Sequence, residues 1–277
     1  MKALVRNHAG DWLGYAALAF ALVQALTPII WMVGGSLKQQ GEFLVAPWRL
    51  PAAPQFGNYA SALANADIGG GLWNSITVVC LGIILLGICA GTTAYALARF
   101  EFRGKAIITG LILFTMMVPP DVLTVPLFVT LRTLGLLGTL PGLACLYASG
   151  SFGMTVFLLR GYFIAIPAEI EDAARLDGAS VLGVLRHVVI PLALPGFSSV
   201  MAIQAMGMWN DLYLALVFVH DPELATAPVG LLAFFQRDSI DWPLLLAALT
   251  LLTLPVLLLF ALLQRRFVEG IVSGGVK

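Results

Sequence analysis

Six apolar runs, each about as long as a membrane span, constrain this chain more than any other feature. A helix needs about 20 apolar residues to cross the hydrocarbon core of a bilayer. The runs occupy residues 12–33, 72–98, 106–131, 141–163, 192–219 and 242–263. The chain is 60% hydrophobic and 11% charged, and a soluble domain of this length needs more surface charge. The sequence therefore predicts an all-α, polytopic membrane protein with six transmembrane helices.

Lysine and arginine are distributed unevenly between the segments that join these runs. If the N-terminus is cytoplasmic, eleven of the fifteen basic residues lie on the cytoplasmic side. This positive-inside bias predicts that both termini are cytoplasmic. We expect a cytoplasmic N-terminus at residues 1–11, one transmembrane domain at 12–265 that includes a cytoplasmic loop at 168–191, and a cytoplasmic tail at 266–277.

Several functions are disfavoured by what the sequence lacks. Its three cysteines form no CxxC pair and its three histidines have no metal-ligand spacing. The net charge is zero, which gives no basic field for nucleic acid. The phosphate-loop pattern GxxxxGK[ST] is missing. We therefore predict no catalytic residue, no metal and no cofactor on this chain, and energy for any transport must come from a partner or an ion gradient.

The loop at 168–191 is unusually polar and patterned for a segment between membrane spans. Pro167 suits the first turn of a helix, and Glu169, Glu171 and Asp172 place negative charge at the positive end of the helix dipole. Gly178 is typical of the residue that ends a helix in the left-handed conformation. A second helix should follow, with Pro191 and Pro195 marking the turn back into the membrane. The small residues of this loop favour close docking over a solvated surface, although a helical linker on the membrane surface is the simpler interpretation.

The same segment resembles the EAA signature of permeases in binding-protein-dependent ABC importers, E-A-A-x3-G-x9-I-x-L-P. The matching positions are Asp172, Ala173, Ala174, Gly178, Val188, Ile190 and Pro191. Asp replaces Glu, Val replaces Ile and Ile replaces Leu, and each replacement keeps the chemical character. The stretches TMMVPPDVLTVPLF, TLGLLGTLPGL, WNDLYLAL and QRRFVEGIVSGGVK also resemble carbohydrate-importer permeases of the maltose type, in particular the second, shorter permease of such systems.

This resemblance implies a type I importer permease fold and a set of partners. They are a second homologous permease, two ATPase subunits that carry ATP and magnesium, an extracytoplasmic solute-binding protein and the lipid of a bacterial cytoplasmic membrane. The loop would dock on an ATPase subunit through the matched positions together with Glu171 and Asp177. The carried solute would be a sugar or a related compound, and these motifs do not distinguish a sugar phosphate, an amino sugar or a polyol.

Polar residues inside the fifth run suggest a translocation path. Asn210 and Asp211 interrupt this run in its outer half, and Gln204 precedes them by one to two turns. An acidic side chain at that depth should face the bundle interior or water. It belongs either to the path or an outer gate, or to a hydrogen-bonded helix break, and the sequence favours neither.

Two other classes of function stay open at this point. A secondary transporter or channel driven by an ion gradient would need several buried ionisable groups, and Asp211 is nearly alone. An intramembrane enzyme would need a nucleophile with its base, a metal set or paired carboxylates, and none stands out. An ATP-driven importer subunit is therefore the favoured prediction.

Overall fold

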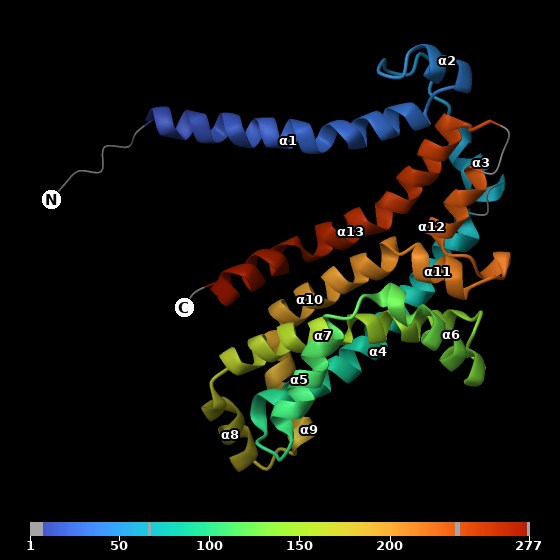
Figure 1. Cartoon of the computed structure of the whole chain (residues 1–277). Coiled ribbons are helices and arrows are strands. Elements are labelled where there is room, and N and C mark those ends of the chain that lie inside the picture. The colour runs from blue at the N-terminus through green and yellow to red at the C-terminus, as the bar shows by residue number, and fades with distance from the viewer. Residues whose placement is uncertain (1–7, 66–67, 236–238, 276–277) are drawn as a thin grey trace. The chain divides into compact units, whose positions relative to one another are not determined.

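The computed structural model describes residues 8–65, 68–235 and 239–275, and this part of the chain is helical without a β-strand (Figure 1). The all-α prediction is confirmed. The α-helices are α1 (His8–Ser36), α2 (Gln40–Val45), α3 (Gly57–Asn65), α4 (Ile68–Arg99), α5 (Lys105–Thr115), α6 (Thr124–Thr133), α7 (Leu140–Ala165), α8 (Ala168–Leu176), α9 (Val181–Val184), α10 (Ile190–Asn210), α11 (Tyr213–Phe218), α12 (Ala227–Gly230) and α13 (Trp242–Gly275). Four short turns complete the order: η1 (Pro120–Leu123), the π-helical η2 (Leu185–Val189), η3 (Pro222–Leu224) and η4 (Leu231–Phe234).

Within the described residues, five helical stretches are long and apolar enough to cross a membrane. They are Gly14–Ser36, Ile68–Arg99, Leu140–Ala165, Val181–Asn210 and Trp242–Gln264. The run expected at 106–131 is not one helix, because α5 ends at Thr115 and α6 begins only at Thr124. Pro119 and Pro120 lie between them, and proline removes a backbone donor and disfavours helix in the residue before it. Among the described residues, five of the six predicted spans are therefore continuous helices of membrane length, and the run at 106–131 contains only the shorter apolar helix α5.

The chain forms two compact units: residues up to Ile68 with Leu231–Thr253, and Gly69–Gly230 with the segment from Leu254 onward. The boundaries expected at 1–11, 12–265 and 266–277 stay a prediction, although α13 remains helical to Gly275.

A buried lysine organises the first unit. The side chain of Lys38 is 1% exposed, and its Nζ donates to the carbonyl oxygens of Ala46 at 2.8 Å and Pro47 at 3.0 Å. Ala46 is the C-cap residue of α2, so the ammonium also lies at the negative end of that helix. Asn58 donates to the Ser36 and Lys38 carbonyls and thereby joins the start of α3 to the end of α1. The long loop after α1 is therefore held by side chain to backbone hydrogen bonds.

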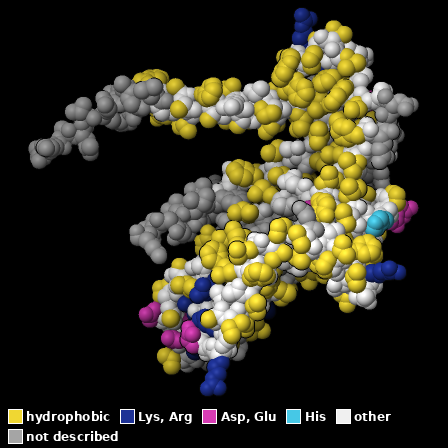
Figure 2. All heavy atoms as spheres, in the orientation of Figure 1, with side chains coloured by type: hydrophobic (Ala, Val, Ile, Leu, Met, Phe, Trp, Pro, Cys, Tyr) yellow, Lys and Arg dark blue, Asp and Glu magenta, His cyan; other side chains and the backbone are white. Residues whose placement is uncertain are grey.

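The second unit is a helical bundle in which α7 packs against α10, α5 and α11. Gly196 of α10 permits one close approach, because a Cβ there would overlap the ring of Tyr162 of α7. Gly87 and Gly91 of α4 lie beside Phe197 of α10, so this GxxxG pair packs within the chain. Figure 1 shows α8 and α9 at one end of this bundle and α6 and α11 at the other. In Figure 2 hydrophobic side chains cover much of this bundle between its charged ends, as expected for a surface that faces lipid.

The prediction that the chain turns at Pro191 and Pro195 is wrong. The chain stays helical from Val181 to Asn210, with Pro191 in the first turn of α10 and Pro195 inside it. Each proline removes one backbone donor. The π-helical turn η2 ends at Val189, two residues before Pro191, and a π-helical insertion is one way for a helix to pass such a gap.

Candidate functional site

The helix α8 has the start and the end that its sequence demands. Pro167 is the N-cap residue and the helix begins one residue later than expected, at Ala168. Gly178 has φ +86°, which confirms the left-handed glycine after the helix. The amide of Ala179 donates to the carbonyl of Ala174 at 3.0 Å and closes the turn. The amides of Asp177 and Gly178 likewise donate to the carbonyls of Ala173 and Arg175, so three carbonyls at the end of α8 are paired.

One face of α8 is open. Of the predicted loop residues, Asp172, Ala173, Asp177 and Gly178 are exposed, while Ala174 is half-buried and packs against the core. The exposed face also carries two large apolar side chains, Ile170 at 43% and Leu176 at 90% exposure. Exposure of a leucine side chain to water is unfavourable, and an exposed apolar side chain flanked by carboxylates is suited to docking on a partner protein. Of the positions predicted to contact the ATPase, Ala174 therefore lies on the side of α8 that packs on the bundle, and the others named here lie on its open face.

The other face of α8 buries a carboxylate. The side chain of Glu171 is 2% exposed. Its Oε2 accepts from the Tyr95 hydroxyl at 2.9 Å, and its Oε1 accepts from Arg99 Nε at 2.5 Å. Tyr95 and Arg99 lie one turn apart at the end of α4. Glu171 thus points into the bundle, and of the acidic pair at 171–172 only Asp172 is exposed.

Arg99 joins three elements at this point. Besides Glu171 of α8, its guanidinium donates from Nη2 to the carbonyl oxygen of Ile166 at 2.7 Å. Ile166 is the C-cap residue of α7, in an extended conformation. A single side chain of α4 therefore binds both the end of α7 and the first turns of α8, so α8 is fixed to the bundle.

The three downstream signature residues support this arrangement. Val188 in η2 and Ile190 in α10 are half-buried and pack against the core, and η2 contacts α8. Pro191 is exposed in the first turn of α10. None of the three shares the open face of α8.

The predicted path residues lie where α10 ends. Asp211 is the C-cap residue, and its Oδ1 accepts from the amides of Leu214 and Ala215 at 3.0 and 3.2 Å and from the Tyr147 hydroxyl at 3.1 Å. The interruption of the fifth run is confirmed, and these bonds are those of a hydrogen-bonded helix break. Asn210 is exposed and its amide donates to the Met206 carbonyl. Gln204 is half-buried and lies about 120° around the helix from Asn210.

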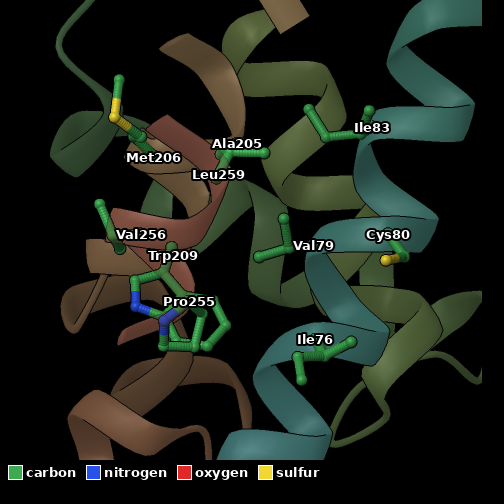
Figure 3. A pocket seen from close by; sticks show the side chains of 10 residues that line it. All are labelled: Ile76, Val79, Cys80, Ile83, Ala205, Met206, Trp209, Pro255, Val256 and Leu259. Atoms are coloured by element: carbon green, nitrogen blue, oxygen red, sulfur yellow. The ribbon is translucent and has the colours of Figure 1, made fainter. Parts of the chain in front are cut away.

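An apolar pocket of about 270 Å³ lies beside this end of α10. In Figure 3 the side chains of α4 line one side, and those of α10 and α13 line the other. Trp209 contributes its indole ring, while Gln204, Asn210 and Asp211 are not among the lining residues. The proposed path residues and this pocket are therefore separate features of the bundle.

Sequence reasoning missed Tyr95 and Arg99 as partners of the loop. Tyr95 and Arg99 are spaced i, i+4 at the end of an apolar run. Residues with this spacing share a helix face, so the pair could have indicated a polar contact with a neighbouring segment. It also did not anticipate the burial of Lys38, which the count of basic residues places only among the four outside the cytoplasm.

Comparison with known proteins agrees with this geometry. Residues 83–272 match the family model of binding-protein-dependent transport system inner membrane components. The chain is 35% identical to the probable ABC transporter permease protein YurM of Bacillus subtilis over 97% of this chain and 89% of that one. It is 34% identical to the diacetylchitobiose uptake system permease protein NgcG of Streptomyces coelicolor, over 98% and 92%.

A solved structure shares the fold. The chain superposes with a TM-score of 0.80 and 25% identity on a chain of a bacterial ABC transporter involved in the import of the acidic polysaccharide alginate. The alignment covers 96% of this chain and 99% of that one.

The helical bundle, together with α8 and its one buried and one open face, defines a multi-pass membrane transport protein with the type I importer permease fold. The chain belongs to the family of inner membrane components of binding-protein-dependent transport systems. It is the permease component, and ATP hydrolysis belongs to other subunits.

Proposed function

We propose that this chain is one permease subunit of an ATP-driven carbohydrate importer and that α8 is its cytoplasmic coupling helix. The observation that carries the proposal is the division of α8 into two faces. Glu171 is fixed inside the bundle, whereas Asp172 and Leu176 project outward. A helix with one face anchored and the other open is suited to transmit movement between two subunits.

The open face supplies the chemistry for docking on an ATPase subunit. Asp172 is 65% exposed and lies 3.4 Å from Arg175, so its carboxylate is open to a basic residue of the partner. Leu176 would enter an apolar groove, and Ala173 and Gly178 would permit close approach. Asp177 lies beside them at the end of the helix.

The remaining partners follow from the family and from the size of the chain. One six-span subunit is small for a sugar path, so a second homologous permease completes it, and α1 is free to pack there because its membrane-length part is not buried in this chain. Two ATPase subunits bind ATP and magnesium, and this chain binds no cofactor. An extracytoplasmic binding protein delivers the solute to the complex in a bacterial cytoplasmic membrane.

The proposed substrate class is an oligosaccharide or a related solute. Support comes from the diacetylchitobiose and alginate systems to which this chain is similar. Gln204, Asn210 and Asp211 are the proposed polar residues of the path or its gate. Uptake of a panel of labelled saccharides by proteoliposomes that hold the complete complex tests this class, and uptake of amino acids alone would contradict it.

Charge reversal at the open face tests the coupling role. Asp172→Lys should reduce co-purification of the ATPase subunit, because it replaces an attractive contact with a repulsive one. Glu101→Lys is the matched control, since Glu101 is 90% exposed on the loop after α4 and pairs only with Lys105 in the part of the chain described. Equal ATPase recovery with both variants and with the wild-type chain would contradict the proposal.

A further inference from the structure

A continuous set of charged side chains connects the open face of α8 with the end of α4. Arg175 lies between the two carboxylates of α8, with Nη1 at 3.4 Å from Asp172 Oδ1 and Nη2 at 3.7 Å from Glu171 Oε2. Glu171 in turn pairs with Arg99. Side-chain exposure is 65% at Asp172 and 40% at Arg175, and it falls to 2% at Glu171 and 12% at Arg99. The series begins at the proposed docking surface and ends inside the bundle.

The inner end of this series is specific in its geometry. Glu171 uses both carboxylate oxygens, one for the Tyr95 hydroxyl and one for Arg99 Nε. Arg99 uses a second nitrogen for the Ile166 carbonyl at the end of α7. Tyr95 is also held by edge-on contacts with the rings of Phe100 and Phe163. A shift of α8 cannot occur without moving or breaking contacts with both α4 and α7.

Stability alone does not account for an ion pair in this place. Desolvation of two charges offsets much of their attraction, and well-packed apolar residues often replace a buried ion pair without loss of stability. What the polar cluster provides, and an apolar contact does not, is a fixed register between α8, α4 and α7. Registry is the best-attested role of buried polar groups.

We propose that Glu171, Arg99 and Tyr95 are positioning residues that transmit the movement of α8 to α4 during transport. This inference rests on the proposed function, since it takes α8 to be the coupling helix. It assigns Glu171 to the interior of this chain, and leaves the direct ATPase contact to Asp172. Breaking the cluster should leave docking intact and separate ATP hydrolysis from solute movement.

The test measures solute transported per ATP hydrolysed in proteoliposomes that hold the complete complex. Glu171→Gln, Arg99→Lys and Tyr95→Phe should each lower this ratio, by about two- to thirtyfold for mutations along a coupling network, while co-purification of the ATPase stays at the wild-type level. The matched control Glu101→Gln removes the same charge from an exposed ion pair nearby and should leave the ratio unchanged.

A double variant separates positioning from folding. Arg99→Leu with Glu171→Leu removes both charges together and so avoids an unpaired buried ion. We expect it to accumulate in the membrane, to bind the ATPase and to have a low transport ratio. A wild-type ratio in this double variant, or in all three single variants, would overturn the inference alone. Failure of the wild-type chain to bind an ATPase subunit would instead overturn the proposed function, and this inference with it.

Discussion

At the scale of single residues, Gly178 sets where α8 ends and Glu171 sets which face of α8 packs on the bundle. The glycine after a short acidic helix predicted a left-handed residue, and the structure has φ +86° there. The side of α8 on which Glu171 lies was not predictable, because its neighbours Asp172 and Glu169 are equally acidic. Its orientation depends on Tyr95 and Arg99, which are more than 70 positions away.

Substitutions at Gly178 should affect coupling according to their backbone preference. No atom lies within 4 Å of a Cβ built at this position, so only conformation matters. A side chain in the left-handed region costs roughly 1–2 kcal/mol, and asparagine adopts it more readily than other residues. Gly178→Val should therefore reduce ATPase co-purification and substrate-stimulated ATP hydrolysis more than Gly178→Asn. Equal activity of the two variants would show that the turn is not needed.

Asp211 should tolerate loss of its charge better than loss of its oxygen atoms. Asp211→Asn keeps an acceptor for the Leu214 and Ala215 amides, whereas Asp211→Leu leaves these donors without it. An unsatisfied buried donor costs about 1–3 kcal/mol. If Asp211 only closes the helix break, the asparagine variant should transport solute and the leucine variant should be less stable to heat. Loss of transport by a stable asparagine variant would assign the charge itself to the path.

At the scale of elements, the apolar runs predicted which segments are helical but not where every helix is continuous. The run at 106–131 divides into α5 and α6 around Pro119 and Pro120, whereas α10 ends at Asn210 and Asp211, where the sequence predicted an interruption. Pro191 and Pro195 looked like the same kind of signal, yet the helix passes through both. The difference lies in tertiary packing, since α10 packs against α7 and η2 packs against α8, and neighbouring helices allow a membrane helix to tolerate proline.

The α7–α10 contact should depend on the small size of Gly196. A Cβ at this position would overlap the Tyr162 ring, and overpacking of a well-packed contact costs about 1–3 kcal/mol. Gly196→Ala should lower the unfolding temperature in detergent. Gly207→Ala on the same helix is the matched control, because no atom lies within 4 Å of its Cβ. Equal unfolding temperatures for the two variants would refute the close contact.

At the scale of the whole molecule, hydropathy and basic residues predicted the class, while the division into two units was not foreseen. The first unit brings the loop after α1 together with the start of α13 through Gln40, which donates to the Ile240 carbonyl and accepts from the Trp242 amide. These residues are about 200 positions apart, and no local pattern indicates such pairing.

Topology is the prediction that belongs to this scale. In a chain with alanine in place of its three cysteines, Leu176→Cys should react with a membrane-impermeant thiol reagent only from the cytoplasmic side. Ala53→Cys, in the exposed loop after α2, should react only from the outside. Labelling of intact cells and of inverted vesicles distinguishes the two sides. Reversed labelling would overturn the orientation inferred from the basic residues.

Photo-crosslinking from α8 tests the central claim most directly. A photoreactive amino acid at Leu176, which is 90% exposed on the open face, should form an adduct with the ATPase subunit in the assembled complex. The same group at Leu50, 80% exposed in the loop after α2, should form none. Absence of an ATPase adduct from Leu176, or an equal adduct from Leu50, would contradict the assignment of α8 as the coupling helix.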